Sequence, residues 1–422
     1  MTRETRLKKR YAAEQRFRMH GIISIIISLF FVGLLLFKVF TGGATAFIKT
    51  TLEVEVNYSK ELLGFKKTLE PTLGEIKEAD FFDVSYQAAT SFYKYSNDEE
   101  EKFIKILLGG NYEQEIKNHL FENPHLLGKK VVLNLTTSDD LDQLHKGNFP
   151  RDIPEDRRRI NNFQLKVYDS LVQQGKIKTK YNNYFLTHGD SRDAEIAGVA
   201  GAIIGSFFSI IICLILAFPI ALLAAVYLEE FAPKNRITEI IEININNLAA
   251  VPSIVFGLLA LGILLNVFGL PRSTSLVGGI TLSLMTLPTI IIACRASLKA
   301  VPPSIREAAL AVGASKVQTT MHHVVPLAMP GTLSGTIIGL AQALGETAPL
   351  LLIGMVAFVV DVPSVPTDPS ASLPVQIYLW SEQAERGFVE KTSATIMLLL
   401  GFLIIMNSLA VWARQKFERK WI

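Results

Sequence analysis

Six apolar runs, each long enough to cross a lipid bilayer as a helix, constrain this chain more than any other feature. They cover residues 21–41, 195–228, 248–270, 276–294, 329–360 and 393–413. A helix needs roughly 20 predominantly apolar residues to cross the hydrocarbon core. The mean hydropathy of +0.31 and the charged fraction of 19% agree with this pattern. The sequence therefore predicts a mainly α-helical membrane protein with six spans.

Two of the runs, residues 195–228 and 329–360, are longer than a bilayer requires. Each contains a proline, Pro219 in the first and Pro349 in the second. Proline lacks the N–H group that a continuing helix needs. We therefore expect both helices to kink at these positions.

Lysine and arginine residues indicate which ends of the spans face the cytoplasm, because short cytoplasmic loops carry an excess of them. Residues 1–20 and the last ten residues are strongly basic, as is the loop at residues 295–328. With six spans, both termini and this loop are expected in the cytoplasm. Residues 1–20 would then be a basic cytoplasmic tail ahead of the first span at residues 21–41.

The segment at residues 42–194, between the first two spans, is long enough to fold as an independent domain. Alternating patterns at residues 52–58 and 130–137 predict strands, and residues 178–188 are a candidate third strand. Helical patterns occupy residues 98–110 and 154–176. We expect an α+β extracytoplasmic domain here, since long domains cross the membrane largely regardless of their charge.

Residues 1–46 have a competing interpretation as a cleaved signal peptide, because the Ala-Thr-Ala at residues 44–46 resembles a cleavage site. The apolar run at residues 21–41 is longer than the apolar part of a signal peptide. Lys38 is also placed to reach the membrane interface as an anchor. These features favour a permanent first span.

The chain has few groups suited to catalysis or metal binding. Its two cysteines, Cys213 and Cys294, lie inside apolar runs, so neither a disulfide framework nor a zinc pattern is present. His322 and His323 are adjacent, and on a helix their side chains diverge by about 100°. There is no Gly-x4-Gly-Lys-Ser/Thr loop, and the net charge of +3 gives no reason to expect nucleic-acid binding. We expect no catalytic residue, no metal and no cofactor in this chain.

A polar stretch follows the fourth apolar run: PPSIREAALAVGASKVQTTMHHVVPLAMPG, residues 302–331. Ser304 begins a Ser-x-x-Glu capping box, so the first helix is expected to start just after it and to end at Gly313. Ser315 is placed to cap a second short helix, which Pro326 is expected to stop. The pattern predicts two short helices joined by a tight turn on the cytoplasmic side.

Within this stretch, the Glu-Ala-Ala-x3-Gly pattern of residues 307–313 resembles the coupling loop of ABC importer permeases. Pro326 falls in register with that family's pattern, whereas His323 and Val325 stand where the family has Ile and Leu. In such importers this loop docks into a groove on an ATPase subunit. By resemblance, the ATPase-coupling surface consists of Glu307, Ala308, Ala309, Gly313 and Pro326.

Four further segments are similar to the PstA-type permease subunit of the phosphate-specific ABC importer: residues 248–264, 286–315, 344–354 and 373–380. This resemblance implies a six-span, type I importer-like permease of the bacterial inner membrane. The permease core would be the five spans at residues 195–422. The domain at residues 42–194 lies outside the minimal family pattern.

The same resemblance implies ATP-driven import of inorganic phosphate with several partners. These are a second, PstC-like permease subunit, a PstB-like ATPase dimer, a periplasmic PstS-like phosphate-binding protein and membrane lipid. Import of another oxyanion, such as sulfate, molybdate or a phosphonate, is the first alternative. A membrane receptor with an external sensor domain is the second; the short predicted cytoplasmic segments argue against it, because a receptor needs an output domain.

The carboxyl group of Glu346 falls near the middle of the fifth predicted span, where a charged group costs about 2.5–3.5 kcal/mol to insert. One interpretation is a protonated side chain bonded to a neighbouring helix, because Gly345 and Thr347 suit close helix packing. The other is a substrate contact that accepts a hydrogen bond from a protonated oxyanion. Arg295, Gln342 and Thr347 complete the predicted substrate path. Arg295 is equally suited to be a membrane anchor, and the family often has arginine at the position of Gln342.

Overall fold

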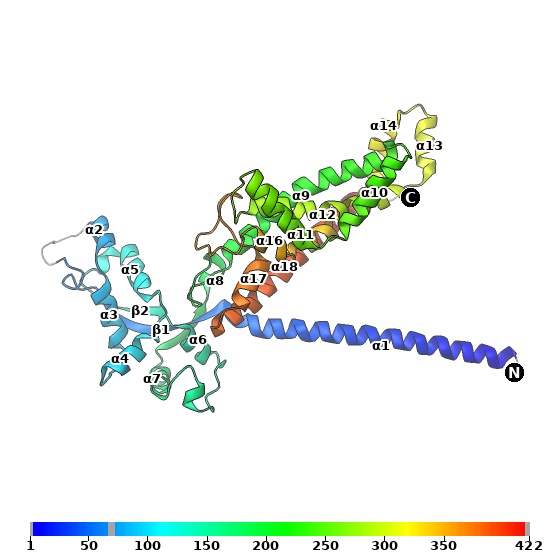
Figure 1. Ribbon diagram of the computed structural model, residues 1–422. Coiled ribbons are helices and arrows are strands. Elements are labelled where there is room, and N and C mark those ends of the chain that lie inside the picture. The colour runs from blue at the N-terminus through cyan, green and yellow to red at the C-terminus, as the bar shows by residue number, and fades with distance from the viewer. Residues whose placement is uncertain (1–2, 66–71, 418–422) are drawn as a thin grey trace.

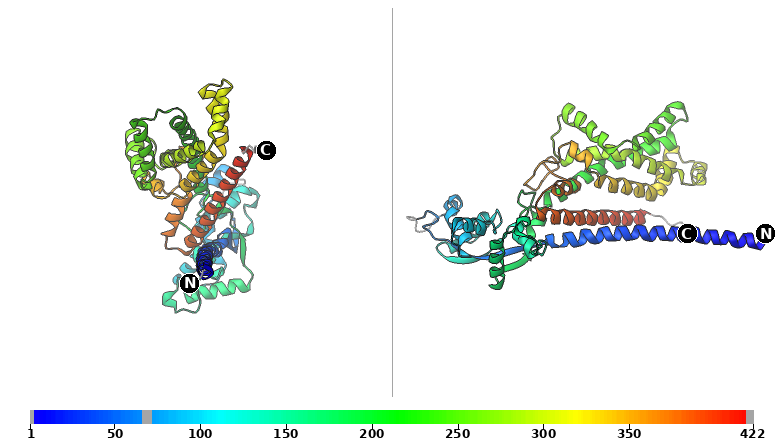
Figure 2. Two further views of the ribbon diagram at one scale, coloured as in Figure 1. Left: turned by 90° about the vertical axis from the view of Figure 1, so that its right-hand side faces the viewer. Right: turned by 60° about the horizontal axis from the view of Figure 1, so that its bottom comes forward.

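The computed structural model describes residues 3–65 and 72–417. Long helices form a bundle, and a smaller domain is attached to one end of it (Figure 1). This domain, residues 44–194, is called the inserted domain because it lies between helices α1 (Arg3–Gly43) and α9 (Ala200–Val226). Helix α1 ends beside the inserted domain at Gly43, and its beginning lies far from that domain (Figure 2).

Four helices form the body of the bundle, and each is long and apolar. They are α9, α12 (Ser275–Lys299), α15 (Val325–Leu344) and α18 (Arg386–Phe417). With α1, five stretches among the described residues are long and apolar enough to cross a membrane. Helix α9 passes through Pro219 without a break and continues into a π-helical turn, η4 (Tyr227–Phe231).

The predicted span at residues 248–270 is not a continuous helix. Helix α10 (Arg236–Ala249) ends before Pro252, and α11 (Ser253–Leu259) begins after it and continues as the π-helical η5 (Ala260–Val267). The two arms meet at 104°. Proline has no N–H to donate and disfavours helical backbone in the residue before it, so the helix ends here. The bent pair makes a sixth span only if both arms are counted together.

The predicted span at residues 329–360 is also interrupted, and the kink expected at Pro349 is a complete break. Helix α15 ends at Leu344, and Pro349 lies in the first turn of the short helix α16 (Ala348–Leu352). The next helix, α17 (Leu373–Ser381), begins only after a long non-helical segment. The apolar run therefore contains most of α15, a break, the short helix α16 and a connecting segment.

Glycine residues allow α12 to lie close to its neighbours α9 and α15. A methyl group added at Gly279 would lie 2.6 Å from the Ile212 side chain, and one added at Gly335 would lie 2.2 Å from Cβ of Ala293. Small residues at such contacts let helix backbones approach closely where lipid offers no hydrophobic driving force. The contacts identify α12 as the central helix of the bundle.

The inserted domain contains a three-stranded antiparallel sheet with the order β2–β1–β3. Its strands are β1 (Ile48–Asn57), β2 (Lys130–Thr136) and β3 (Ile177–Tyr181). All three strands predicted from the sequence are confirmed. The third ends earlier than the candidate run at residues 178–188, because the chain turns into helix α8 (Asn183–Thr187).

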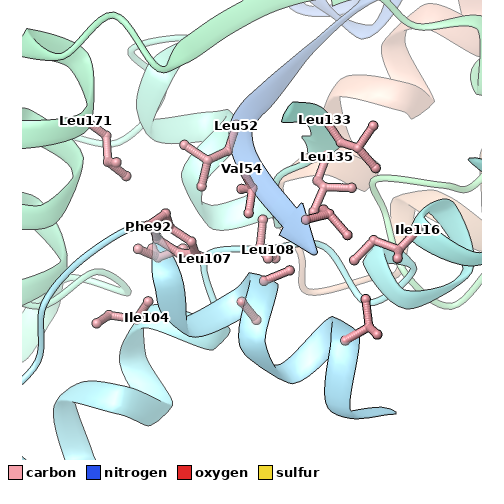
Figure 3. Packing of buried hydrophobic residues seen from close by; sticks show 14 of the residues in the cluster. Leu52, Val54, Phe92, Ile104, Leu107, Leu108, Ile116, Leu133, Leu135 and Leu171 are labelled. Carbon is pink, nitrogen blue, oxygen red and sulfur yellow. The ribbon is translucent and has the colours of Figure 1, made fainter. Parts of the chain in front are cut away.

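Helices cover the apolar face of this sheet. They are α2 (Leu73–Glu78), α3 (Phe82–Ser91), α4 (Asp98–Lys105), α5 (Tyr112–Glu122), α6 (Asp139–His145) and α7 (Asn162–Gln173). Leu52, Val54 and Val56 of β1 are buried, while Glu53 and Glu55 between them are more exposed, as alternation along a strand requires. Figure 3 shows Leu52 and Val54 beside Leu107 and Leu108 in this core.

A buried group of charged residues joins the inserted domain to the first turns of α18. The ammonium group of Lys146 lies 2.9 Å from Glu390 and 2.6 Å from Asp142. Glu390 also accepts a hydrogen bond of 2.6 Å from Gln143, and the Gly387 amide donates to Asp139 at 3.1 Å. Buried ion pairs add little net stability, but they fix geometry because an unpaired partner would be costly. The inserted domain is therefore held to α18 in a defined orientation.

Helix α1 also meets α18 at this end of the bundle. A methyl group added at Gly43 would lie 2.6 Å from the backbone nitrogen of Ala394, so the two backbones are in direct contact there. The apolar part of α1 is otherwise bare: none of the residues in its most apolar window is buried. The inserted domain, α1 and α18 therefore converge at one place.

We predict that Asp139→Asn stabilises the protein above pH 7 and leaves its stability unchanged near pH 4. Burial raises the pKa of Asp139 to about 6, with Asp140 and Asp142 adding to the rise, although the hydrogen bond from Gly387 opposes it. Because the pKa of the carboxyl group is higher in the folded than in the unfolded protein, its contribution to stability is greatest below the pKa of the unfolded chain, about 3.9. This contribution is lost as the pH rises through 6. The loss is on the order of 3 kcal/mol.

Thermal unfolding of the purified protein at pH 4, 6 and 8 tests this prediction. Asparagine keeps an oxygen that accepts the Gly387 hydrogen bond but has no charge to bury. The exposed Asp156→Asn serves as the matched control. An Asp139→Asn variant that is less stable than the wild type at pH 8 would contradict the assignment.

Candidate functional site

The polar stretch singled out in the sequence forms a compact elbow (residues 302–326) at the end of the bundle opposite the inserted domain (Figure 1). Its first helix, α13, spans Pro303–Ala311, and its second, α14, spans Lys316–Thr319. The two predicted helices are thus present. The start of the first is not as predicted: α13 begins at Pro303 after Pro302, with no side-chain cap from Ser304. Proline suits the first helical position because its N–H would be unpaired there anyway.

Gly313 and Ser315 make the turn between the two helices. Gly313 has φ +90°, a backbone conformation that favours glycine. Ser315 caps α14 as predicted: its hydroxyl accepts a hydrogen bond from the Gln318 amide at 3.2 Å, and the Gln318 side chain accepts one from the Ser315 amide at 2.9 Å. These local bonds hold the tip of the elbow in one shape.

The elbow exposes small and apolar side chains around this turn. Glu307, Ala308 and Gly313 are exposed, whereas Ala309 is buried beneath them. Apolar side chains with at least 48% of their surface exposed surround them: Leu310, Val312, Val317 and Met321. Val312, at 86%, is the most exposed of the four. A group of exposed apolar side chains around one turn is typical of an interaction site.

Pro326 does not stop the second helix, contrary to the prediction. After α14 the chain continues through a π-helical turn, η6 (Thr320–Val324), directly into α15, so one helical rod runs from Lys316 to Leu344. The π-helical turn changes the hydrogen-bond pattern just before the proline, which lacks a donor. Pro326 is half-buried at the start of α15 and is not part of the exposed surface. The exposed His322 and His323 lie in the π-helical turn.

Charged residues bind the elbow to the ends of α9 and α12. Arg306 of α13 pairs with Glu230 of η4 at 2.8 Å. Arg295 of α12 pairs with the adjacent Glu229 at 2.5 Å and with Glu242 of α10 at 2.8 Å. The two consecutive glutamates at the end of α9 thus contact two different elements, and Arg295 is neutralised by two carboxylates.

This arrangement favours a structural role for Arg295 over the substrate-path interpretation, which stays a prediction. Its side chain is buried and already has two carboxylate partners, so its charge is not available to balance an anion. The arginine acts as a structural link between α9, α10 and α12. The sequence alone did not point to Glu229, Glu230 or Glu242. The available signal was the Glu-Glu pair directly after an apolar run, because the short segments predicted to lie in the cytoplasm are usually basic.

The remaining predicted path residues gather at the break between α15 and α16. Glu346 and Thr347 lie in the break itself and are half-buried, and Gln342 is exposed in the last turn of α15. The sequence suggested that Glu346 lies in the middle of a continuous helix, whereas the structure places it between two helices. At the break the backbone amides of Gly345 and Glu346 still donate to the carbonyls of Gln342 and Ala343, and the polar groups placed there are the half-buried carboxyl of Glu346 and hydroxyl of Thr347. Such groups are suited to contact a polar solute.

Comparison with known proteins places most of the chain in two segments. Residues 196–420 match the family model described as binding-protein-dependent transport system inner membrane component. Residues 4–155 match a domain of unknown function, DUF3333, so most of the inserted domain belongs to a recurrent unit.

The phosphate transport system permease protein PstA 1 of Mycobacterium tuberculosis is 33% identical over 204 residues, which is 48% of this chain and 66% of that protein. The chain thus spans slightly less than two thirds of that relative. PstA of Yersinia pestis is 30% identical over 223 residues, covering 52% of this chain and 74% of that protein. PstA of Haemophilus influenzae is 30% identical over 226 residues, covering 54% and 78%.

The match at residues 196–420 covers the helical bundle from α9 to α18 and the elbow. The elbow supplies an exposed surface at one end, and the bundle supplies the long apolar helices that an inner membrane component requires. Because the family model covers more than half of its residues, the chain belongs to the binding-protein-dependent transport system inner membrane component family, the permease subunits of ABC transporters.

Proposed function

We propose that this chain is a transmembrane permease subunit of an ATP-driven importer of inorganic phosphate. The observation that carries the proposal is the elbow: a helical turn with small and apolar residues exposed around Gly313, at the opposite end of the bundle from the inserted domain. The names of the relatives support phosphate as the substrate.

The proposed topology has six spans, with the bent pair of α10 and α11 counted as one. The elbow, both chain ends and the loop before α10 would face the cytoplasm, and the inserted domain would lie on the outer side of the bacterial inner membrane. Two observations support this: the elbow and the inserted domain lie at opposite ends of the bundle, and basic residues concentrate at the termini and the elbow.

The elbow would dock into a groove on a PstB-like ATPase dimer. Glu307, Ala308 and Gly313 are exposed and suited to direct contact, while the buried Ala309 and half-buried Pro326 support them from beneath. A second, PstC-like permease would complete the substrate path, and a periplasmic PstS-like binding protein would deliver phosphate. Alternating access would follow from ATP-driven movement of the elbow.

Phosphate would pass the break between α15 and α16. Glu346 would accept a hydrogen bond from a P–OH group, which sulfate lacks at neutral pH, and Thr347 can donate from its hydroxyl. The chain offers Gln342, not arginine, beside them. Because Arg295 is neutralised by Glu229 and Glu242, the positive charge that balances the anion would come from the second permease subunit.

The specific observation of Gln342 also favours a second candidate, the same machine acting on another oxyanion such as sulfate, molybdate or a phosphonate. Uptake of labelled phosphate by the reconstituted complex, with sulfate and molybdate as competitors, separates the two. Phosphate import is supported if unlabelled phosphate competes and the other anions do not. If sulfate or molybdate competes better than unlabelled phosphate does, that anion and not phosphate is the substrate.

We predict that Glu346→Gln lowers phosphate uptake by about tenfold and reduces the preference for phosphate over sulfate. The carboxylate accepts a charge-assisted hydrogen bond that an amide oxygen replaces only in part, and the difference is on the order of 1–2 kcal/mol. Glu382→Gln, an exposed position after α17, is the matched control. Unchanged flux and selectivity in Glu346→Gln would show that this carboxyl group does not contact the substrate.

We also predict that Gly313→Ala reduces uptake and ATPase co-purification more than Gly313→Asn does. No heavy atom lies within 4 Å of a methyl group added here, so the cost is backbone strain at φ +90° rather than a clash. That strain is about 1–2 kcal/mol for alanine, and asparagine tolerates positive φ better. If the alanine variant takes up phosphate as fast as the wild type, the turn at Gly313 is not needed for coupling.

A further inference from the structure

Arg306 joins three elements at the elbow end of the bundle. One guanidinium nitrogen, Nη1, donates to the Val301 carbonyl at 2.7 Å, and Nη2 donates to the Leu298 carbonyl at 2.9 Å. Nη2 and Nε also donate to Glu230 Oε1, at 2.8 and 3.1 Å. A side chain on α13 is thus bound to the end of α12, to the linker after it and to the end of α9.

The carbonyl contacts have a clear physical basis. The last carbonyl groups of a helix have no partner within the helix, and an arginine there satisfies them while its positive charge interacts favourably with the helix dipole. Leu298 lies in the last turn of α12, and Val301 follows Ala300, the residue that caps that helix. Arg306 therefore caps α12 from outside while its own backbone belongs to α13.

The contact with Glu230 is largely shielded from solvent, since only 9% of the Glu230 side chain is exposed. The neighbouring Glu229 points to Arg295 of α12 and also lies 3.4 Å from Lys299. Successive side chains on a helical turn diverge, so the pair reaches α13 with one residue and α12 with the other. The end of α9 is bound to both elements.

We propose that Arg306 is a positioning residue that transmits displacement of the elbow to the ends of α9 and α12. This inference rests on the proposed function. The other contacts between the elbow and the bundle are less directional: Ile305 packs against the apolar cluster at the ends of α9, α12 and α15, and the Lys316 ammonium lies 5.3 Å from the centre of the Phe231 ring. Arg306 supplies directed hydrogen bonds to α9 and α12 at once.

Lysine cannot replace arginine in this arrangement. The planar guanidinium presents five donors in a fixed fork, whereas an ammonium group is a single point with three donors. A lysine at this position keeps the charge and can pair with Glu230, but it cannot also reach both carbonyl groups in the same geometry. The proposal therefore predicts that Arg306→Lys uncouples the elbow although the charge is conserved.

The test uses the complete importer in proteoliposomes, with the permease pair, the ATPase dimer and the binding protein. Three quantities are measured: basal ATP hydrolysis, its stimulation by phosphate-loaded binding protein, and phosphate imported per ATP hydrolysed. We expect Arg306→Lys to lower phosphate imported per ATP by about tenfold, the effect of losing one charge-assisted hydrogen bond, with basal hydrolysis and assembly retained. Glu239→Gln, an exposed carboxylate on α10, is the matched control and should behave as the wild type.

Glu230→Gln provides a second, milder test because glutamine keeps the acceptor oxygen and the shape while losing the charge. A several-fold drop in coupling with normal assembly supports the proposal. Wild-type coupling in Arg306→Lys overturns it. Failure of both variants to assemble with the ATPase also overturns it, because the arginine would then serve assembly rather than transmission.

The experiment distinguishes failure of the Arg306 proposal from failure of the proposed function. If the wild-type complex shows no phosphate-stimulated hydrolysis and no phosphate uptake, the proposed function fails before any variant is compared. If the wild type imports phosphate and Arg306→Lys couples as well as it does, only the role of Arg306 is lost.

Discussion

The requirement that buried backbone N–H and C=O groups be paired decides where this chain can bend. Long helices satisfy these groups internally, so the five apolar stretches run without interruption for most of their length. The chain bends at residues 250–252, next to Pro252, and at residues 345–347, next to Pro349. At Pro326 and Pro219 the helix continues instead, in the first case with help from a π-helical turn. Whether the helix breaks or continues at a proline thus depends on how the structure compensates for the backbone N–H that proline lacks.

Charged residues gather at both ends of the bundle, and in each place they join parts of the chain that are distant in sequence. At the elbow end, Glu229 and Glu230 meet Arg295 and Arg306, more than 60 residues later in the sequence. At the other end, Lys146 of the inserted domain meets Glu390, more than 240 residues later. Such pairs give orientation rather than net stability. The bundle is therefore geometrically defined at its ends, where a transporter exchanges force and substrate with other proteins.

The turn of the elbow could be predicted from the sequence, because glycine and serine each have one dominant effect at the end or the start of a helix. Gly313 adopts the positive φ that only glycine favours, and Ser315 caps the helix after it. The start of α13 and the effect of Pro326 differ from the prediction, since proline is tolerated at the start of a helix and after a π-helical turn. The partners of Arg295 were not predictable, because a single sequence does not show which acidic residues the fold brings near it. Glu346 was misplaced for a similar reason: an apolar run shows length but not where the helix within it ends.

The direct contact between Gly43 and Ala394 has a geometric consequence for α1. This contact lies at one extremity of a helix of 41 residues, which is about 60 Å long. A rod held at one extremity acts as a long arm, so a tilt of roughly ten degrees about that point would sweep its far end through about 10 Å. The basic residues near the beginning of α1 sit on that far end. A small rearrangement where the two backbones touch is thereby enlarged at the far end of the helix.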